Sequence, residues 1–432
     1  LPTYPFQRER YWVAGESKRA KGVSSSVADP TNDWLYETVW KVGAGLVREG
    51  EPRLSGVPAL GEVRERVEQQ LPAVAAENGL ETYDALLPEL DALCGLYIRK
   101  GFRDLGVSLK KGDRISGEEL RVRLGILDRH RRLLDRLLVI LAEEGVLRKE
   151  GVEWELVQPL TNEDPDHRVC QLLERFPTHQ AELRVAARCG ERLADVLRGR
   201  ADPLQVLFPG GSVDLAEQLY QEAPAARVFN TLVREVMRII VGALDTGRTI
   251  RVLEIGAGTG ATTAHVLSVL PEERTEYLFT DVSRLFLGKA EEKFRAQASL
   301  RYKILDIERD PVEQGVAPHT FDVVIASNVL HATADLRRTL ANVRRLLAPE
   351  GVLVLLEATG PHRFEDLTVG LTDGWWRFSA LDLRPSYALL SQERWVELLR
   401  EEGVTDPVAV PARSSELRER ATGALRYRLE IE

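Results

Sequence analysis

From Arg251 onward the sequence alternates between short apolar runs and longer amphipathic segments, which is typical of a parallel sheet with helices between its strands. The predicted strands cover 251–255, 277–280, 301–304, 321–326 and 352–357. Two further runs, 407–410 and 424–432, are predicted to close the sheet at its edge as an antiparallel pair. This order predicts an α/β fold with a doubly wound sheet.

The part of the chain before this alternation has a helical pattern. Apolar residues from Leu86 to Tyr97 recur at helical spacing, and a helix through 129–141 is followed by a short hairpin, which is a winged-helix-like arrangement. Two further helices are predicted over 167–175 and 179–199, and an amphipathic helix over about 225–245. We therefore predict a mostly helical lid over 55–228 and an α/β core over 229–432.

Composition and charge exclude several classes of protein. The 432 residues are 44% hydrophobic and contain no apolar run long enough to span a bilayer, so no membrane association is predicted. The net charge of −9 argues against nucleic-acid binding, which favours excess positive charge. The three scattered cysteines favour a reducing compartment, the cytoplasm, over a disulfide framework, and no metal-ligand spacing is present.

A glycine-rich turn follows the first predicted strand of the core. Gly256, Gly258 and Gly260 allow the backbone to approach a ligand closely and to present amide groups to it at the start of a helix. Together with Ala261, the first two glycines also satisfy the loose dinucleotide pattern, so nicotinamide or flavin binding remains open at this point.

Three acidic residues lie at the carboxyl ends of the first three predicted strands. Glu254 precedes the glycines, where it suits a ligand with an ammonium group, and Asp281 is placed to accept hydrogen bonds from ribose hydroxyls. Asp306 is placed to accept from an adenine amino group while Ile307 packs on the ring. This set suits S-adenosylmethionine, which has no phosphates and carries a sulfonium. The predicted cofactor site comprises Glu254, Gly256, Gly258, Gly260, Asp281, Val282, Asp306, Ile307 and Asn328.

The sequence resembles the C-methyltransferase domains embedded in modular type I polyketide synthases. The resemblance rests on the ordered segments LEIGAGTG, FTDVS, LDIERDPVEQG, SNVLHATADLRRTL, VRRLLAPEGVLVLLE and GWWRF, and on DPLQVLFPGG and LYQEAPAARVFN before them. Mild departures are Ala261 where a second glycine is usual, Glu350 before Gly351, and FSALDLR after the double tryptophan. The last departure lies near the expected substrate entrance.

The first 54 residues resemble other parts of such synthases. LPTYPFQRERYW is similar to the linker that follows an acyltransferase domain, so residues 1–33 are interpreted as a post-acyltransferase linker. WLYETVW is similar to the strand that begins the structural half of a ketoreductase, so 34–54 are interpreted as a segment of that type. Because residue 1 is Leu, we expect the chain to be part of a longer polypeptide.

The resemblance implies a class I, Rossmann-like methyltransferase core under a helical lid, with S-adenosylmethionine as cofactor and S-adenosylhomocysteine as product. It implies an acyl carrier protein with its bound polyketide intermediate as partner, and neighbouring acyltransferase and ketoreductase domains.

His331 and Glu357 are the predicted catalytic residues. His331 follows the fourth core strand and Glu357 ends the fifth, and the ends of adjacent parallel strands lie side by side. A neutral imidazole beside a carboxylate can accept a proton, and the carboxylate stabilises the resulting imidazolium. In the resembled family a His–Glu pair at these positions removes an α-proton. We therefore predict methyl transfer to the α-carbon of a carrier-bound β-ketoacyl chain.

Three residues are predicted to line the substrate pocket. Tyr220 and Asn230 fall in the resembled segment before the core, and Trp376 is the second residue of the double tryptophan. The basic run Arg129, Arg131, Arg132 and Arg136 is interpreted as a solvated face or a docking patch for an acidic carrier protein.

Alternative functions remain at this stage. An O-methyltransferase acting on a β-hydroxyl or enol oxygen would use the same His–Glu pair, and the lack of a dehydratase-like motif between linker and lid favours it. A third possibility is a domain without catalytic activity that only scaffolds a synthase. A fourth is an oxidoreductase that binds a dinucleotide.

Overall fold

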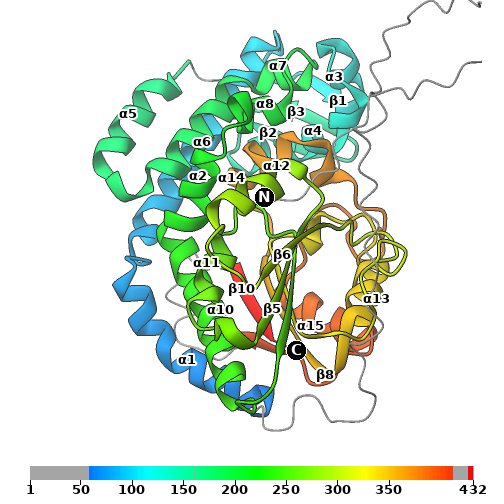
Figure 1. Cartoon of the computed structure of the whole chain (residues 1–432). Coiled ribbons are helices and arrows are strands. Elements are labelled where there is room, and N and C mark those ends of the chain that lie inside the picture. The colour runs from blue at the N-terminus through cyan, green and yellow to red at the C-terminus, as the bar shows by residue number, and fades with distance from the viewer. Residues whose placement is uncertain (1–57, 161, 412–426, 432) are drawn as a thin grey trace, which may run out of the picture. The chain divides into compact units, whose positions relative to one another are not determined.

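The computed structural model describes residues 58–160, 162–411 and 427–431, the last of these as backbone only (Figure 1). The predicted linker over 1–33 and the strand segment over 34–54 lie outside the described residues. So do residues 424–426 and 432 of the last predicted strand.

A seven-stranded sheet forms the centre of the C-terminal half (Figure 1). Its strands are β4 (Ile250–Ile255), β5 (Thr275–Asp281), β6 (Leu300–Ile304), β7 (Phe321–Ser327), β8 (Leu347–Ala358), β9 (Val408–Val410) and β10 (Tyr427–Ile431). The order across the sheet is β6-β5-β4-β7-β8-β10-β9, with β4 to β8 paired in parallel and β10 antiparallel to both neighbours. The predicted α/β class is confirmed, and the closing pair adds to the sheet beyond β8.

Helices cover both faces of this sheet because its strands are apolar on both sides. On β7, Val323 and Ile325 join one hydrophobic cluster, while Val324 and Ala326 join the other. The first cluster includes α10 (Pro224–Ala243), α11 (Ala261–Leu267) and α12 (Arg284–Lys293). The second includes α13 (Leu336–Leu346) and α15 (Gln392–Glu401).

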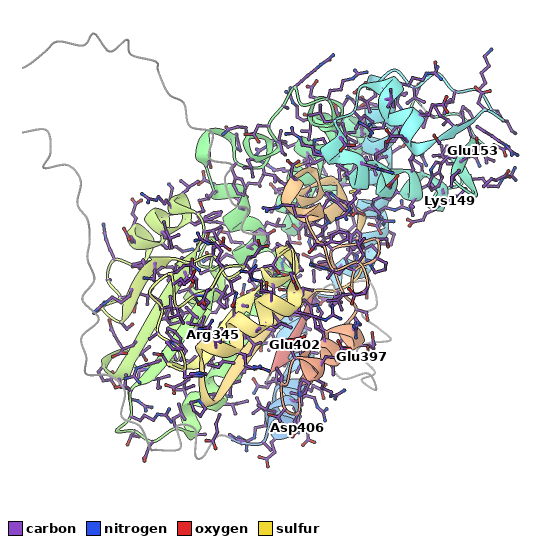
Figure 2. All side chains as sticks on the ribbon, turned by 90° about the vertical axis from the view of Figure 1, so that its right-hand side faces the viewer. Lys149, Glu153, Arg345, Glu397, Glu402 and Asp406 are labelled. Carbon is purple, nitrogen blue, oxygen red and sulfur yellow. The ribbon has the colours of Figure 1, made fainter. Side chains whose placement is uncertain are left out.

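The lid is mostly helical, as predicted. Its helices are α1 (Leu60–Glu77), α2 (Thr82–Asp104), α3 (Gly117–Leu124), α4 (Arg131–Glu143), α5 (Pro165–Arg175), α6 (Gln180–Glu191), α7 (Leu193–Leu197), α8 (Pro203–Leu207) and α9 (Asp214–Glu217). The segment predicted as one helix over 179–199 is divided between α6 and α7. The predicted hairpin is β2 (Leu147–Glu150) with β3 (Glu153–Leu156), and β1 (Arg114–Ser116) pairs with β3. Figure 2 shows exposed Lys149 and Glu153 on this hairpin.

The lid packs directly on the core. Leu86 of α2, Leu137 of α4 and Leu183 of α6 belong to the same hydrophobic cluster as α10 and one face of the sheet. Helix α1 contacts α10 and the edge strand β9, which both belong to the core. The predicted boundary at residue 228 falls within α10, so the division into domains stays a prediction. None of the helices in the described ranges combines the length and hydrophobicity needed to cross a membrane.

The basic run, which begins just before α4 and continues along it, does not form a continuous solvated face. Arg132 donates to the backbone carbonyl of Phe378 at 2.8 Å and stacks on its ring, and Arg136 donates to the Asp366 carboxylate at 2.7 Å. The interpretation as a solvated or docking face is therefore wrong for these two residues. Folding brings a core segment rich in acceptors against α4, and the guanidinium groups pair with it.

Candidate active site

The glycine turn, residues 256–260, connects β4 to α11. Gly256, Gly258 and Gly260 all have positive φ angles, of 61°, 54° and 70°. A Cβ atom on Gly260 would lie 2.6 Å from the ring of Phe294. The turn therefore depends on glycine both for its backbone conformation and for its close packing.

Replacing Gly260 with alanine should destabilise the fold by at least about 1–2 kcal/mol, since a left-handed conformation is costly for residues with a Cβ. Gly242→Ala is the matched control, because Gly242 lies within α10 and a Cβ added there would meet no neighbouring atom within 4 Å. That substitution should stabilise by about 0.5–1 kcal/mol. Urea unfolding of both variants tests the prediction, and equal effects would contradict it.

Two cavities meet at Gly256, which lines both. The first contains about 830 Å³ of space, partly open to solvent, and includes Glu254, Gly258, Asn328, Tyr220 and Asn230 among its lining residues. The second is lined by Val282, Asp306 and Ile307 from the ends of β5 and β6. Most of the predicted cofactor residues thus line one of two neighbouring cavities at the carboxyl edge of the sheet, while Asp281 and Gly260 line neither.

Glu254 and Asp281 are carboxylates buried beneath the glycine turn. Glu254 Oε2 accepts hydrogen bonds from the hydroxyls of Thr263 and Tyr277, both at 2.5 Å. Burial raises the pKa of Glu254 to about 7. Asp281 accepts from the backbone amides of Gly258 at 3.0 Å and Ser283 at 2.7 Å, and burial raises its pKa to about 6. Through these bonds Asp281 holds the glycine turn and the segment after β5 in place.

His331 and Glu357 are in direct contact. Glu357 Oε1 accepts from the backbone amides of Val329 at 3.2 Å and Leu330 at 2.8 Å, while Oε2 contacts Nδ1 of His331. Both side chains are buried, at 3% and 1% exposed. When the imidazole is neutral and donates from Nδ1 to Glu357, Nε2 is the ring nitrogen without a proton.

The surroundings of His331 restrict access to Nε2. This nitrogen is buried and has no hydrogen-bond partner among the described residues. The Trp375 ring lies edge-on to the imidazole, with centroids 5.2 Å apart. The buried guanidinium of Arg384 donates to the carbonyl of His331 at 2.8 Å and to that of Thr333 at 2.8 Å. The loop is thus held rigidly beside the cavities, although His331 lines neither of them.

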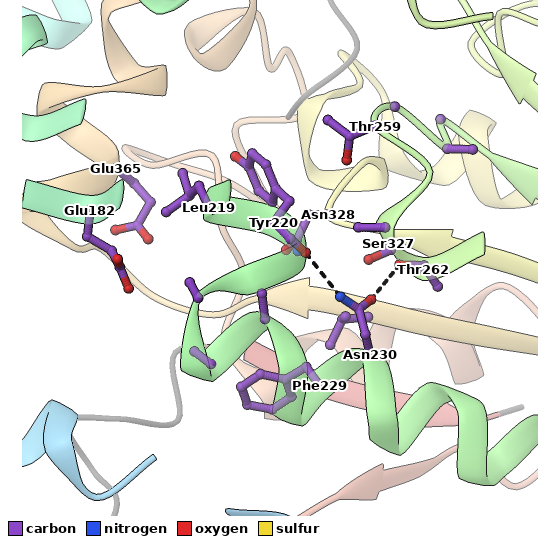
Figure 3. A pocket seen from close by; sticks show the side chains of 18 of the residues that line it. Glu182, Leu219, Tyr220, Phe229, Asn230, Thr259, Thr262, Ser327, Asn328 and Glu365 are labelled. Atoms are coloured by element: carbon purple, nitrogen blue, oxygen red, sulfur yellow. Dashed lines mark hydrogen bonds between the residues drawn. The ribbon is translucent and has the colours of Figure 1, made fainter. Parts of the chain in front are cut away.

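The predicted pocket residues have different placements. Tyr220 lies on the π-helical turn Gln218–Glu222, and its carbonyl accepts from the Asn230 amide at 3.1 Å (Figure 3). Asn230 also accepts from Thr262 at 2.8 Å, so it joins the lid to the helix after the glycine turn. Both residues line the first cavity. Trp376 lines neither cavity and is packed in the core, where it donates to the carbonyl of Gly370.

Two carboxylates that were not predicted from the sequence also line the first cavity, Glu182 on α6 and Glu365 on α14 (Arg363–Leu367). A signal for Glu182 was present. It lies three and four residues before buried Val185 and Ala186, and therefore on the apolar face of its helix. The loop and short helix that carry Glu365 have no comparable periodicity.

Comparison with known proteins gives a consistent set of relatives. Residues 253–353 match a family model described as a methyltransferase domain. The chain is 33% identical over 325 residues to the non-reducing polyketide synthase adrD of Penicillium roqueforti, covering 74% of this chain but only 13% of that synthase.

Three solved structures are similar over most of the chain. The CurJ carbon methyltransferase is 38% identical with a TM-score of 0.82, covering 86% of this chain and 97% of that one. The CMeT domain of the citrinin polyketide synthase is 26% identical with a TM-score of 0.75, covering 86% and 95%. The trans-methyltransferase CalH, solved in complex with SAH, is 27% identical with a TM-score of 0.57, covering 75% and 84%.

Proposed function

The chain belongs to the S-adenosylmethionine-dependent carbon-methyltransferase domains of polyketide synthases, and we propose that it methylates the α-carbon of a β-ketoacyl chain carried by an acyl carrier protein. The observation that supports this reaction is the buried His331–Glu357 pair, whose Nε2 is an unpaired base at the end of the sheet. Delivery by the carrier protein, neighbouring acyltransferase and ketoreductase domains and a cytoplasmic location are parts of the same proposal.

The residues at the two cavities fit S-adenosylmethionine. Glu254 would hold its ammonium group and Asp306 its adenine amino group. Asp281 lines neither cavity, so it would reach the ribose hydroxyls only after the glycine turn above it moved. Val282 and Ile307 line the second cavity beside Asp306 and would pack against the ring. Asn328 and the glycine turn form the wall of the first cavity, with left-handed backbone that brings amides close to a ligand. The relative CalH was solved with SAH, which supports the choice of cofactor, while the role of each residue is our proposal.

In the proposed reaction, His331 Nε2 takes the α-proton, so that the C–H electron pair becomes an enolate on the substrate. Glu357 stabilises the imidazolium and keeps the ring in orientation through Nδ1. The cofactor, when bound, supplies a methyl group that forms a bond to the α-carbon as its bond to sulfur breaks, with the electron pair left on sulfur. Because Nε2 is buried in this structure, the side chains that cover it, including Trp375, must move when the substrate binds.

Binding of S-adenosylhomocysteine should depend on the ionisation of Glu254. The ammonium group favours the carboxylate, so affinity should be flat above about pH 7 and fall by up to about tenfold per pH unit below it. Without ligand, the stability of the fold depends on pH in the opposite direction. Its raised pKa makes the contribution of Glu254 to stability largest below about pH 4.5, and this contribution is lost as pH rises through about 7.

Calorimetric titration with S-adenosylhomocysteine at several pH values measures this linkage. Glu254→Gln should bind more weakly and with a flatter pH profile. Glu276→Gln is the matched control, because that residue is exposed on the neighbouring strand. An unchanged profile in Glu254→Gln would show that another group controls binding.

The proposed reaction can be tested with two carrier proteins, one loaded with a β-ketoacyl chain and the other with the matching β-hydroxyacyl chain. Each is incubated with S-adenosylmethionine and the protein, and the intact mass is measured. We expect a gain of one or more methyl groups on the β-ketoacyl carrier only. A gain on the β-hydroxyacyl carrier only would show that the acceptor is oxygen and would refute the proposal.

A further inference from the structure

The first cavity has polar groups at two ends, and both apolar side chains and the polar residues Tyr220 and Asn230 line the space between them. One end is formed by the glycine turn with Thr259, Ser327 and Asn328, and the walls include Leu219, Phe229 and Phe364. Figure 3 shows Glu182 and Glu365 well separated from Thr259 and Ser327, with their carboxyl groups turned toward each other. Apolar walls suit an acyl chain, and a polar group at the far end determines which chains fit.

Glu182 is held in place from the lid side. Its Oε1 accepts a hydrogen bond from the hydroxyl of Tyr83 and lies 3.2 Å from Nδ1 of His179. The other imidazole nitrogen lies 2.7 Å from the hydroxyl of Thr82, so the supporting ring is fixed at both ends. These contacts occupy one carboxylate oxygen only.

The second oxygen of Glu182 is unpaired. Oε2 is buried without a hydrogen-bond partner among the described residues, in a residue that is 4% exposed and lines the cavity. Leaving a buried carboxylate oxygen unpaired is costly, and such atoms are rare in folded proteins. A donor supplied by a ligand in the cavity would remove this cost.

This end of the cavity is lined by two carboxyl groups. Glu365 reaches the cavity from α14, and none of the residues that line the cavity is lysine or arginine. Burial is the main cause of the raised pKa of Tyr220, and the Glu365 carboxylate raises it further. The electrostatic effect of Glu365 therefore reaches another residue that lines the cavity. A ligand group placed here would be favoured if it carried hydrogens that the two carboxylates can accept.

We propose that Glu182, supported by Tyr83 and His179, forms with Glu365 a specificity subsite that binds a hydrogen-bond donor, a hydroxyl or an ammonium group, on the acyl chain of the acceptor. The subsite rests on the proposed function, because it assumes that this cavity receives the acyl chain. It selects among β-ketoacyl chains by their distal end, at a distance from the carbon that is methylated.

The test uses three β-ketoacyl pantetheine thioesters of equal length that end in a methyl, a hydroxyl or an ammonium group. For the wild-type chain, kcat/KM should be about 10- to 100-fold higher for at least one donor-bearing thioester than for the methyl-terminated one, mainly through KM. Equal kcat/KM for all three would overturn the subsite and leave the proposed function intact. If none of the three were methylated, the proposed function would fail and the subsite with it.

Substitutions of Glu182 test whether this residue causes the preference for donor-bearing thioesters. Glu182→Gln keeps the size of the side chain and removes its charge, so a preference for ammonium should fall at least about tenfold. Glu182→Leu removes the acceptors and should abolish either preference while the methyl-terminated thioester is still methylated. Glu191→Gln, an exposed position on the same helix, is the matched control. A preference that survives in Glu182→Leu would overturn the proposal.

Discussion

Replacing His331 with alanine is expected to lower kcat for methyl transfer about 10²- to 10⁴-fold, the range that a positioned general base contributes. The effect should appear in kcat rather than in cofactor affinity, because His331 lines neither of the two cavities. Rapid-quench kinetics with a β-ketoacyl carrier, together with S-adenosylhomocysteine titration, separate the two quantities.

His167→Ala is the matched control for this experiment, because His167 is exposed on α5. Glu357→Gln provides a second comparison. An amide in place of the carboxylate loses the charge that stabilises the imidazolium, so kcat should fall and the double variant should be little worse than His331→Ala alone. Additive losses would show that the two residues do not act as a unit, and a His331→Ala variant with full activity would remove it as the base.

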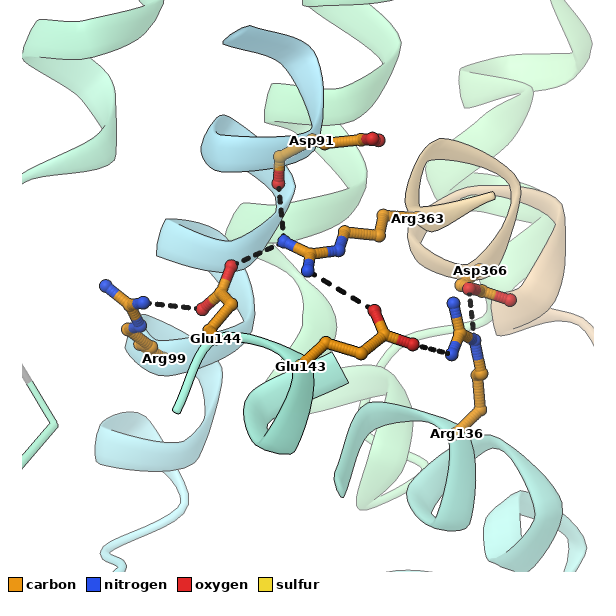
Figure 4. A network of polar contacts seen from close by, with 7 residues as sticks. All are labelled: Asp91, Arg99, Arg136, Glu143, Glu144, Arg363 and Asp366. Atoms are coloured by element: carbon orange, nitrogen blue, oxygen red, sulfur yellow. Dashed lines mark hydrogen bonds and ion pairs between the residues drawn. The ribbon is translucent and has the colours of Figure 1, made fainter. Parts of the chain in front are cut away.

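Replacing Arg136 with alanine is expected to destabilise the protein by about 3–5 kcal/mol, because it leaves a buried carboxylate without its cationic partner. Figure 4 shows Arg136 between Asp366 and Glu143, with Nε 2.7 Å from Asp366 and Nη1 2.9 Å from Glu143. The Asp366 side chain is 0% exposed, and it also accepts from the hydroxyl of Tyr387 at 2.7 Å. Burial raises its pKa to about 6 even with the arginine present.

The same network joins the lid to the helix that follows Glu357. Arg363 on α14 donates to Glu144 at 2.6 Å and to Glu143 at 3.3 Å, and Glu144 also pairs with Arg99 of α2 (Figure 4). Loss of Arg136 should therefore loosen α14 and its cavity residue Glu365 as well as lower stability.

Urea unfolding at neutral pH measures the loss of stability. Arg131→Ala, an exposed neighbour on α4, should change stability by no more than about 0.5 kcal/mol. The double variant Arg136→Ala with Asp366→Asn should lose less than the sum of the single changes, since the neutral amide no longer leaves a buried charge unpaired. A loss in Arg136→Ala no larger than in Arg131→Ala would contradict the account of this ion pair.

Much of the α/β core could be predicted because short apolar runs alternate with amphipathic segments and glycines follow the first run. Parallel topology then brings the ends of β7 and β8 together, which is why the contact between His331 and Glu357 could be anticipated from chain order. For the same reason most of the predicted cofactor residues line the two cavities, although Asp281 and Gly260 do not. Their roles in binding and catalysis stay predictions.

Other features depend on packing between distant segments, which periodicity does not reveal. The sequence pattern at Trp375 and Trp376 is the same for a core residue and a pocket residue, and the structure packs Trp376 against Tyr387. The basic run has the pattern of a solvent face, but the segment from Asp366 to Phe378 pairs with two of its members, Arg132 and Arg136. Glu182 enters the cavity only because α6 is packed against the core, although its position on an apolar helix face was visible.

The most direct test of the central claim identifies the bond that is formed. A β-ketoacyl carrier with ¹³C at the α-carbon is incubated with S-adenosylmethionine carrying a ¹³C-labelled methyl group, and the product is examined by NMR. We predict a one-bond carbon–carbon coupling between the two labels, and no such product with His331→Ala. A labelled methyl bonded to oxygen, with no carbon–carbon coupling, would contradict the assignment of this chain as an α-carbon methyltransferase.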